Sequence, residues 1–103
     1  KKFRIDFLQE ELDEFKEACD VNDHEKMVDA LCDLVYVALG TAHLWGYYWP
    51  AHWSRVQDAN MHKLKATTGM VGPRGNVEFD VIKPEGWTPP NHTGLLEAYG
   101  FDV

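Results

Sequence analysis

The stretch FRIDFLQEELDEFKEACDVNDHEKMVDALCDLVYVALGTAHLWG, residues 3–46, decides the fold of this chain. Apolar residues recur in it at helical spacing on either side of a short polar break, residues 20–23. We predict an amphipathic helix over residues 3–19 and a more apolar second helix, which is capped at Asn22 and ends at Gly46. Because so short a break lets two helices fold back antiparallel, we expect an all-α, antiparallel helix bundle.

Acidic side chains gather on one face of each predicted helix. Glu11 and Glu14 share a face of the first helix because they are three residues apart. Asp29 and Asp33, four apart, share a face of the second. If the helices pair, these carboxylates meet and repel one another unless a cation neutralises them, and hard oxygen ligands suit Mg²⁺ or Mn²⁺. Alternatively the acids are only a solvated surface, although Asp29 and Asp33 lie in the most apolar helix, where unpaired carboxylates are costly.

The chain after Gly46 predicts a third helix. Pro50 suits its first turn, and the helix is expected to run to about Lys65 or Ala66. Asn60 and Lys63 lie near its end at helical spacing. A lysine beside a metal cluster can hold a phosphate as a point charge, so this pair is a candidate substrate contact.

The C-terminal third differs in character because Gly and Pro are frequent between residues 69 and 90. The alternation of Val77, Phe79 and Val81 indicates a short strand or an extended arm, and a last short helix is expected near residues 94–99. We therefore expect one domain over residues 1–103. Its helical core would span residues 1–68, and its extended C-terminal arm residues 69–103.

The segment KPEGWTPP, residues 83–90, stands out within this arm. Its rigid turn residues would hold Lys83 or Trp87 in place. Packing of the arm on a partner subunit explains the same residues equally well.

The bulk composition limits the classes of function. A chain of 103 residues that is 45% hydrophobic makes one small packed domain, and part of its apolar surface is expected to be buried in a homo-oligomer. A net charge of -7 argues against broad binding to nucleic acid. No apolar run approaches ~20 residues, so no membrane span is expected. Cys19 and Cys32 are predicted to be buried free thiols of a reducing compartment. The chain begins without Met, so an N-terminal segment is expected to precede it.

The order of these motifs resembles one family. Glu10-Glu11-Leu12-Asp13-Glu14 matches the E-E-x-x-E motif of the all-α nucleoside triphosphate pyrophosphohydrolases, the MazG-like superfamily. The second motif of that superfamily, E-x-x-D, would end at Asp33, but Ala30 stands at its first position and the acid lies one residue earlier. This D-A-L-x-D version resembles a subgroup of bacterial and phage members. The run Ala59-Asn60-Met61-His62-Lys63 and the KPEGWTPP arm are similar to the same subgroup.

The resemblance implies hydrolysis of a nucleoside triphosphate between its α and β phosphates, which gives a monophosphate and pyrophosphate. It implies two or three Mg²⁺ or Mn²⁺ ions, a dimer or a dimer of dimers, and the cytoplasm of a bacterium or of a phage-infected cell. The substrate is expected to be a deoxynucleotide, such as dGTP. The implied metal ligands are Glu11, Glu14 and Asp33, with Asp29 as a further ligand or a supporting acid. The implied phosphate contacts are Asn60, Lys63 and Lys83. A carboxylate of Glu10, Glu11 or Glu14 is near enough in sequence to orient the attacking water, and Lys63, with Lys83 or Arg74, would neutralise the remaining phosphate charge.

Two other classes fit parts of the pattern. A di-iron carboxylate bundle needs Glu-x-x-His pairs, and no Glu in the sequence has a His three residues later. A non-catalytic helical module for dimerisation or regulation would leave the acids as a plain surface. It would then bind no metal and hydrolyse no nucleotide.

Overall fold

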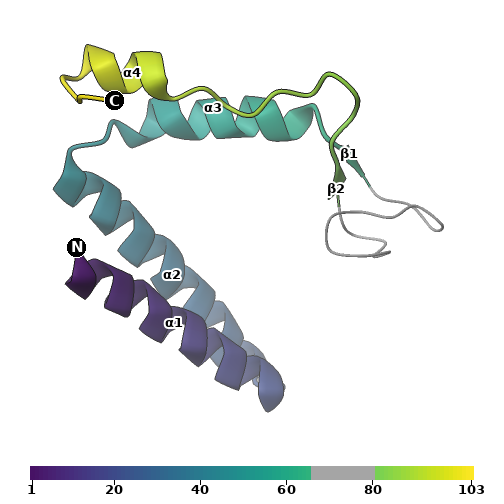
Figure 1. The fold of residues 1–103 in the computed structure, drawn as a ribbon. Helices are drawn as coiled ribbons and strands as arrows, with labels where there is room; N and C mark the ends of the chain where they lie inside the picture. Colours follow the sequence, from purple (N-terminus) through teal and green to yellow (C-terminus); the bar gives the residue numbers. More distant parts are fainter. Residues whose placement is uncertain (66–80) are drawn as a thin grey trace. The chain divides into compact units, whose positions relative to one another are not determined.

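The structure of the chain is a computed structural model that describes residues 1–65 and 81–103. Helices dominate these residues, and only a pair of two-residue strands interrupts them, so the all-α prediction is confirmed (Figure 1). The elements in chain order are α1 (Lys2–Asp20), α2 (His24–Trp45), α3 (Trp49–Met61), β1 (Leu64–Lys65), β2 (Val81–Ile82) and α4 (Thr93–Ala98). The chain divides into two compact units, residues 1–49 and 50–103, which are described in turn.

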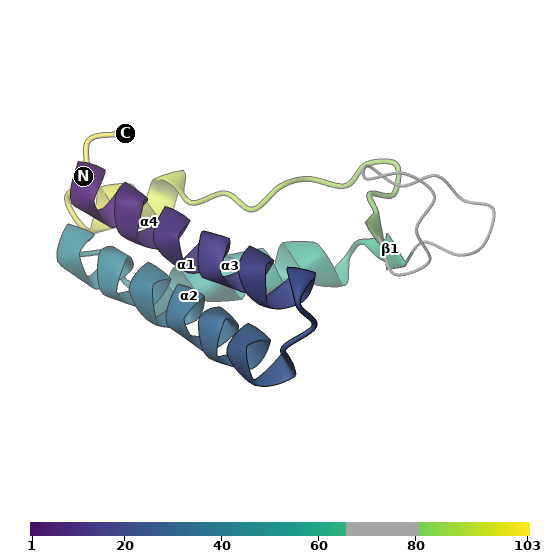
Figure 2. The ribbon, with the colours of Figure 1, turned by 90° about the horizontal axis from the view of Figure 1, so that it is seen from below.

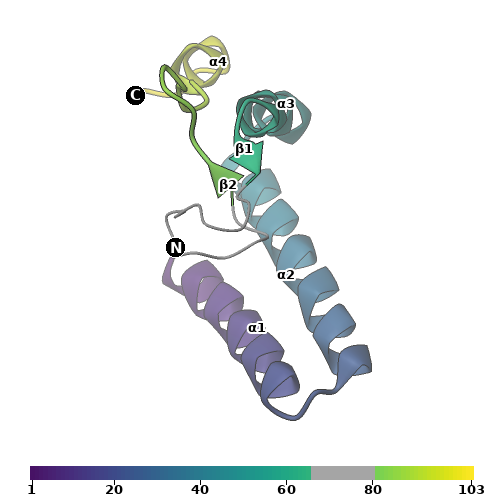
Figure 3. The ribbon, with the colours of Figure 1, turned by 90° about the vertical axis from the view of Figure 1, so that its right-hand side faces the viewer.

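The first unit is a helical hairpin in which α1 and α2 run antiparallel, side by side (Figures 2 and 3). Ala18 of α1 is buried, and so are Ala30, Val37 and Ala42 of α2. Because most of these side chains are small, the two helix backbones can approach closely. Glu11 is the one charged side chain that is buried among the described residues, and only 7% of it is exposed.

The side chain of Arg4 joins the start of α1 to α2. Its Nε donates a hydrogen bond to Thr41 Oγ1 at 3.0 Å, and its Nη2 donates to the carbonyl oxygen of Val37 at 3.0 Å. A Cβ atom at Gly40 would lie 3.0 Å from the same Nη2. Gly40 therefore makes room for this guanidinium.

The turn between α1 and α2 differs from the prediction in its cap. The cap of α2 is Asp23, whose carboxylate accepts a hydrogen bond from the backbone N–H of Lys26 at 3.1 Å. Asn22 instead adopts a positive φ of 54°, which asparagine tolerates better than most residues, and reverses the chain. At the other end, Gly46 ends α2 with a φ of 79°, as predicted.

Several residues expected in the core are exposed. Cys19 and Cys32 are free thiols, but both are exposed rather than buried. The apolar side chain of Leu12 is also 48% exposed, because the face of α1 toward α2 is formed by residues such as Glu11 and Ala18. The buried face of α1, its inner stripe, is thus rotated away from the most apolar face of the helix.

By length and composition alone, α2 could cross a membrane, with a mean hydropathy of 1.4. The core helix of a soluble protein passes the same test. Since α2 carries Asp29 and Asp33 and packs along α1, the test gives only weak evidence for a span.

The second unit contains α3, the strand pair and the C-terminal segment that returns beside α3 to α4 (Figure 1). Helix α3 ends at Met61, earlier than predicted, because Leu64 and Lys65 pair with Ile82 and Val81 in an antiparallel ladder. The short final helix occurs as expected. Val77 and Phe79 lie outside the described residues.

A pair of histidines ties the C-terminal segment to α3. His52 Nδ1 and His92 Nδ1 are 2.7 Å apart, and the two ring centroids are 4.9 Å apart. Desolvation, followed by the charges of His92 and Arg55, lowers the pKa of His52. A hydrogen bond between two such nitrogens needs one donor and one acceptor, so at least one ring of the pair is neutral.

Candidate functional site

Three of the predicted acids meet in the first unit. Glu11, Glu14 and Asp33 each offer a carboxylate oxygen, and these atoms all lie within 4.8 Å of one another. The spacing of three residues brings Glu11 and Glu14 to one face of α1, and the antiparallel pairing brings Asp33 of α2 to the same place. No other group of three metal-ligand side chains occurs in residues 1–65 and 81–103.

Glu11 is the most unusual member of this cluster. Its Oε2 atom is buried and has no hydrogen-bond partner among the described residues. Burial raises the pKa of Glu11, and the neighbouring Glu14 raises it further through its charge and a shared hydrogen bond. Asp33 and Glu10 add smaller repulsions. Glu11 thus has an unpartnered carboxylate oxygen that lies among other carboxylates. A bound cation would offset the repulsion between these charges.

Asp29 lies apart from this trio. It is exposed and lines a cavity of about 450 Å³ between the end of α1 and the start of α2. Glu14 belongs both to the acid cluster and to the wall of this cavity, which also contains Glu17 and Lys26. The structure thus places Asp29 beside the acid cluster, with Glu14 as the link. Glu10 is exposed on α1.

The predicted phosphate contacts belong to the second unit. Asn60 lies in the last turn of α3, and the backbone N–H of Lys63 donates to its carbonyl oxygen at 3.1 Å. Lys63 Nζ and Lys83 Nζ both lie near the ring of Trp87, at 5.2 Å and 5.0 Å from its centroid. Arg74 lies outside the described residues.

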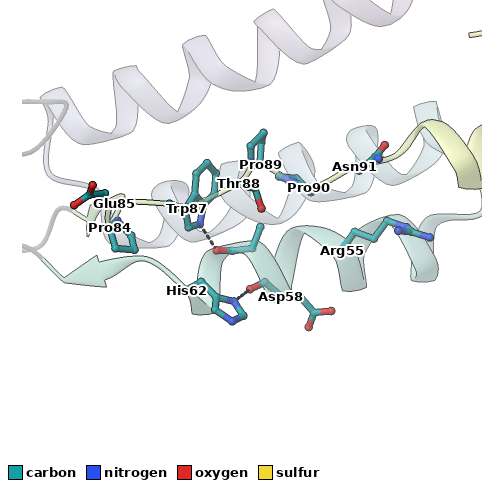
Figure 4. A pocket seen from close by; sticks show the side chains of 12 residues that line it. Arg55, Asp58, His62, Pro84, Glu85, Trp87, Thr88, Pro89, Pro90 and Asn91 are labelled. Carbon is teal, nitrogen blue, oxygen red and sulfur yellow. Dashed lines mark hydrogen bonds between the residues drawn. The ribbon is translucent and has the colours of Figure 1, made fainter.

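A second cavity, of about 480 Å³, is formed by α3 and the segment 84–91 (Figure 4). Arg55 and Asp58 line it from α3, His62 lines it from the turn after the helix, and Trp87 lines it from the segment. The indole N–H of Trp87 donates to the carbonyl oxygen of Ala59 at 2.7 Å (Figure 4). Because two lysines lie over its ring, Trp87 is poorly placed to stack on a nucleobase.

Sequence reasoning missed two features of these sites. Lys26 and Glu17 face the first cavity, and the only signal was their helical spacing from Asp29 and Glu14. The placement of Trp87 near both lysines depends on pairing between residues far apart in sequence, which no local pattern reports.

Comparison with known proteins adds one match. Residues 1–60, more than half of the chain, match the family described as phosphoribosyl-ATP pyrophosphohydrolase. The matched region contains α1, α2 and nearly all of α3, and therefore includes the whole acid cluster. No curated protein matches the chain significantly.

Proposed function

The chain belongs to the phosphoribosyl-ATP pyrophosphohydrolase family of the MazG-like all-α superfamily and is a nucleotide pyrophosphohydrolase, and we propose that it hydrolyses a deoxynucleoside triphosphate, such as dGTP, to the monophosphate and pyrophosphate. The observation that carries this proposal is the cluster of Glu11, Glu14 and Asp33, with its unpartnered buried oxygen. The proposed reaction depends on divalent metal ions.

The donor set fits such a metal. All three side chains offer carboxylate oxygens, the ligands preferred by Mg²⁺ and Mn²⁺. Two or three bound ions would supply a ligated water of lowered pKa and would neutralise charge on the phosphates. Asp29, across the neighbouring cavity, is proposed as a further ligand or as an acid that supports one.

The protein groups have separate tasks in this proposal. Glu11, Glu14 and Asp33 hold the cations, without which an acidic chain would repel a triphosphate. A carboxylate that is not fully used as a ligand, from Glu10, Glu11 or Glu14, orients the attacking water and accepts its proton. Lys63 stabilises the negative charge that develops on the departing pyrophosphate.

Asn60, Lys63, Lys83 and Arg74 are proposed as phosphate contacts. For Lys63 and Lys83 the support is their proximity to one aromatic ring. Asn60 precedes Lys63 on the same turn, and its amide can donate to a phosphate oxygen. Arg74 is proposed because its positive charge would neutralise phosphate charge.

A panel of nucleotides tests the substrate. We expect Mg²⁺-dependent release of equal amounts of monophosphate and pyrophosphate from at least one deoxynucleoside triphosphate, with dGTP among the fastest. Phosphoribosyl-ATP belongs in the panel because the family is named after it. If it were hydrolysed far faster than every deoxynucleotide, the proposed substrate would be replaced by it. If nothing were hydrolysed with Mg²⁺ or Mn²⁺, a non-catalytic helical module would remain.

We also propose that two copies of the chain pair through α2. Four apolar side chains at helical spacing on this helix are between 41% and 61% exposed: Val28, Leu31, Val35 and Leu39. A small domain with so few buried apolar side chains gains stability by covering such a face. A dimer, or a dimer of dimers, would do this.

Light scattering tests the proposed assembly. We expect a dimer or tetramer at micromolar concentration, and Val35→Glu should shift it to monomer because a charge would be buried in the interface. Val35→Ala is the matched control and should leave the assembly intact. A wild-type monomer at the same concentration would mean that another part of the chain covers this face.

A further inference from the structure

Two lysines flank the short strand pair at the same end. Leu64 pairs with Ile82 and Lys65 with Val81, so Lys63 and Lys83 are the residues next to the first of these pairs. Both ammonium groups lie close to one ring, that of Trp87. The two nitrogens are therefore no further apart than the two distances combined, about 10 Å.

This arrangement is unfavourable for the protein alone. Two like charges held near one ring repel each other. No ion pair between either lysine and a carboxylate is seen in the described parts of the chain. A negatively charged ligand with several oxygens would offset the repulsion between the lysines.

Trp87 is itself held firmly. Its indole N–H donates to the Ala59 carbonyl at 2.7 Å, and its backbone N–H donates to the Pro84 carbonyl at 3.0 Å. Gly86, in the turn between them, has a φ of 80°, a conformation that glycine adopts without strain. The ring is thus a fixed surface, whereas each lysine reaches it on a long flexible side chain.

We propose that Trp87 is a positioning residue: it holds Lys63 and Lys83 together as a binding site for the phosphate groups of a polyphosphate anion. The inference rests on the proposed role of these lysines as phosphate contacts, and it adds a role for the Trp87 ring. A cation over an aromatic face keeps its ammonium hydrogens available to a second partner, so the ring can hold the lysines while they bind phosphate. In this arrangement Trp87 does not recognise the base.

Binding of inorganic tripolyphosphate to metal-free protein tests the proposal. Calorimetry on the full chain, stripped of metal on a chelating resin, excludes any contribution from metal held by the acid cluster. We expect measurable binding, weakened about tenfold by Lys63→Gln or Lys83→Gln.

Trp87→Leu should weaken the binding of tripolyphosphate to a similar extent. Trp87→Phe retains a ring but loses the hydrogen bond to Ala59, and should weaken binding about two- to fivefold. Lys16→Gln, an exposed lysine of α1, is the control and should bind as wild type.

Kinetics separate positioning from a merely structural role. In the intact enzyme Trp87→Phe should raise KM for the nucleotide and also lower kcat, because Lys63 both contacts phosphate and stabilises charge on the departing pyrophosphate. Its helical circular dichroism should match wild type. If Trp87→Leu and Trp87→Phe bound tripolyphosphate as tightly as wild type, the proposal would be overturned. Unchanged binding by both lysine variants would overturn it as well. If binding followed the expected order but no nucleotide were hydrolysed, the anion site would stand and the proposed function would fail.

Discussion

Glu14→Gln is expected to slow metal-dependent release of pyrophosphate by at least about a hundredfold, while the helical fold is retained. Loss of a group that merely supports a metal ligand costs about ten- to a hundredfold in affinity or activity, so loss of a ligand should cost no less. Glu14 is exposed and belongs both to the acid cluster and to the wall of the neighbouring cavity. Its amide replacement keeps the shape of the side chain but removes the charge that holds a cation.

The controls for this variant come from the same helices. Asp33→Asn, on α2, should have a similar effect because its oxygen belongs to the same cluster. Asp13→Asn alters the residue next to Glu14, an exposed carboxylate that accepts a hydrogen bond from Gln9, and should hydrolyse the nucleotide at the wild-type rate. Near-normal turnover by Glu14→Gln and Asp33→Asn would show that the cluster does not hold the catalytic metal.

The second large effect concerns stability. A divalent cation that binds only the folded state at one hundred times its Kd adds about 2.7 kcal/mol to the free energy of unfolding. For a chain of this size that corresponds to a rise in Tm of about 10–20 °C. We expect this rise with Mn²⁺ or Mg²⁺ in wild type. It should be lost in Glu11→Gln, which cannot hold the cation as a carboxylate does.

Without metal, Glu11→Gln should raise the stability of the protein. The pKa of Glu11 is raised by burial and by Glu14, so between its ordinary value of 4.5 and the raised value the folded state binds more protons than the unfolded state. The stability contributed by this group therefore falls as the pH rises through that window and stays low above it. Glu11→Gln has no such proton to lose. Above the window, metal-free Glu11→Gln should therefore melt several degrees higher than metal-free wild type.

Thermal melts of the two proteins, with and without metal and across pH, check both signs together. The informative quantity is the difference in Tm between wild type and Glu11→Gln, since the other titrating groups contribute to both proteins. A metal-free wild type that was more stable than Glu11→Gln at neutral pH would contradict the assignment of Glu11 as a buried carboxylate repelled by its acidic neighbours.

The helices and the main acid cluster could be predicted from sequence because both depend on local spacing. The periods of three and four residues that define α1 and α2 also place Glu11, Glu14 and Asp33 on facing sides. The cap was wrong by one residue, since Asn22 and Asp23 both suit a helix start and only the turn conformation decides between them.

Other features could not be predicted because they depend on contacts between distant residues. The end of α3 at Met61 follows from a strand pair with residues 81 and 82, and helical propensity alone favoured a longer helix. The exposure of Cys19 follows from rotation of the inner stripe of α1, which places the charged Glu11 inward. A buried acid cannot be distinguished from a surface one by periodicity when both fit the same helix.

The turn between Asp20 and His24 sets the alignment of the two acidic helices. The length of this turn therefore limits how the chain can evolve. Adding or removing one residue there would rotate the faces of α2 by about 100° relative to α1. Asp33 would then leave Glu11 and Glu14, although every acid would still be present in the sequence. Substitutions in this turn are therefore tolerable where its conformation survives, whereas a change in its length would dismantle the acid cluster without altering any of its members.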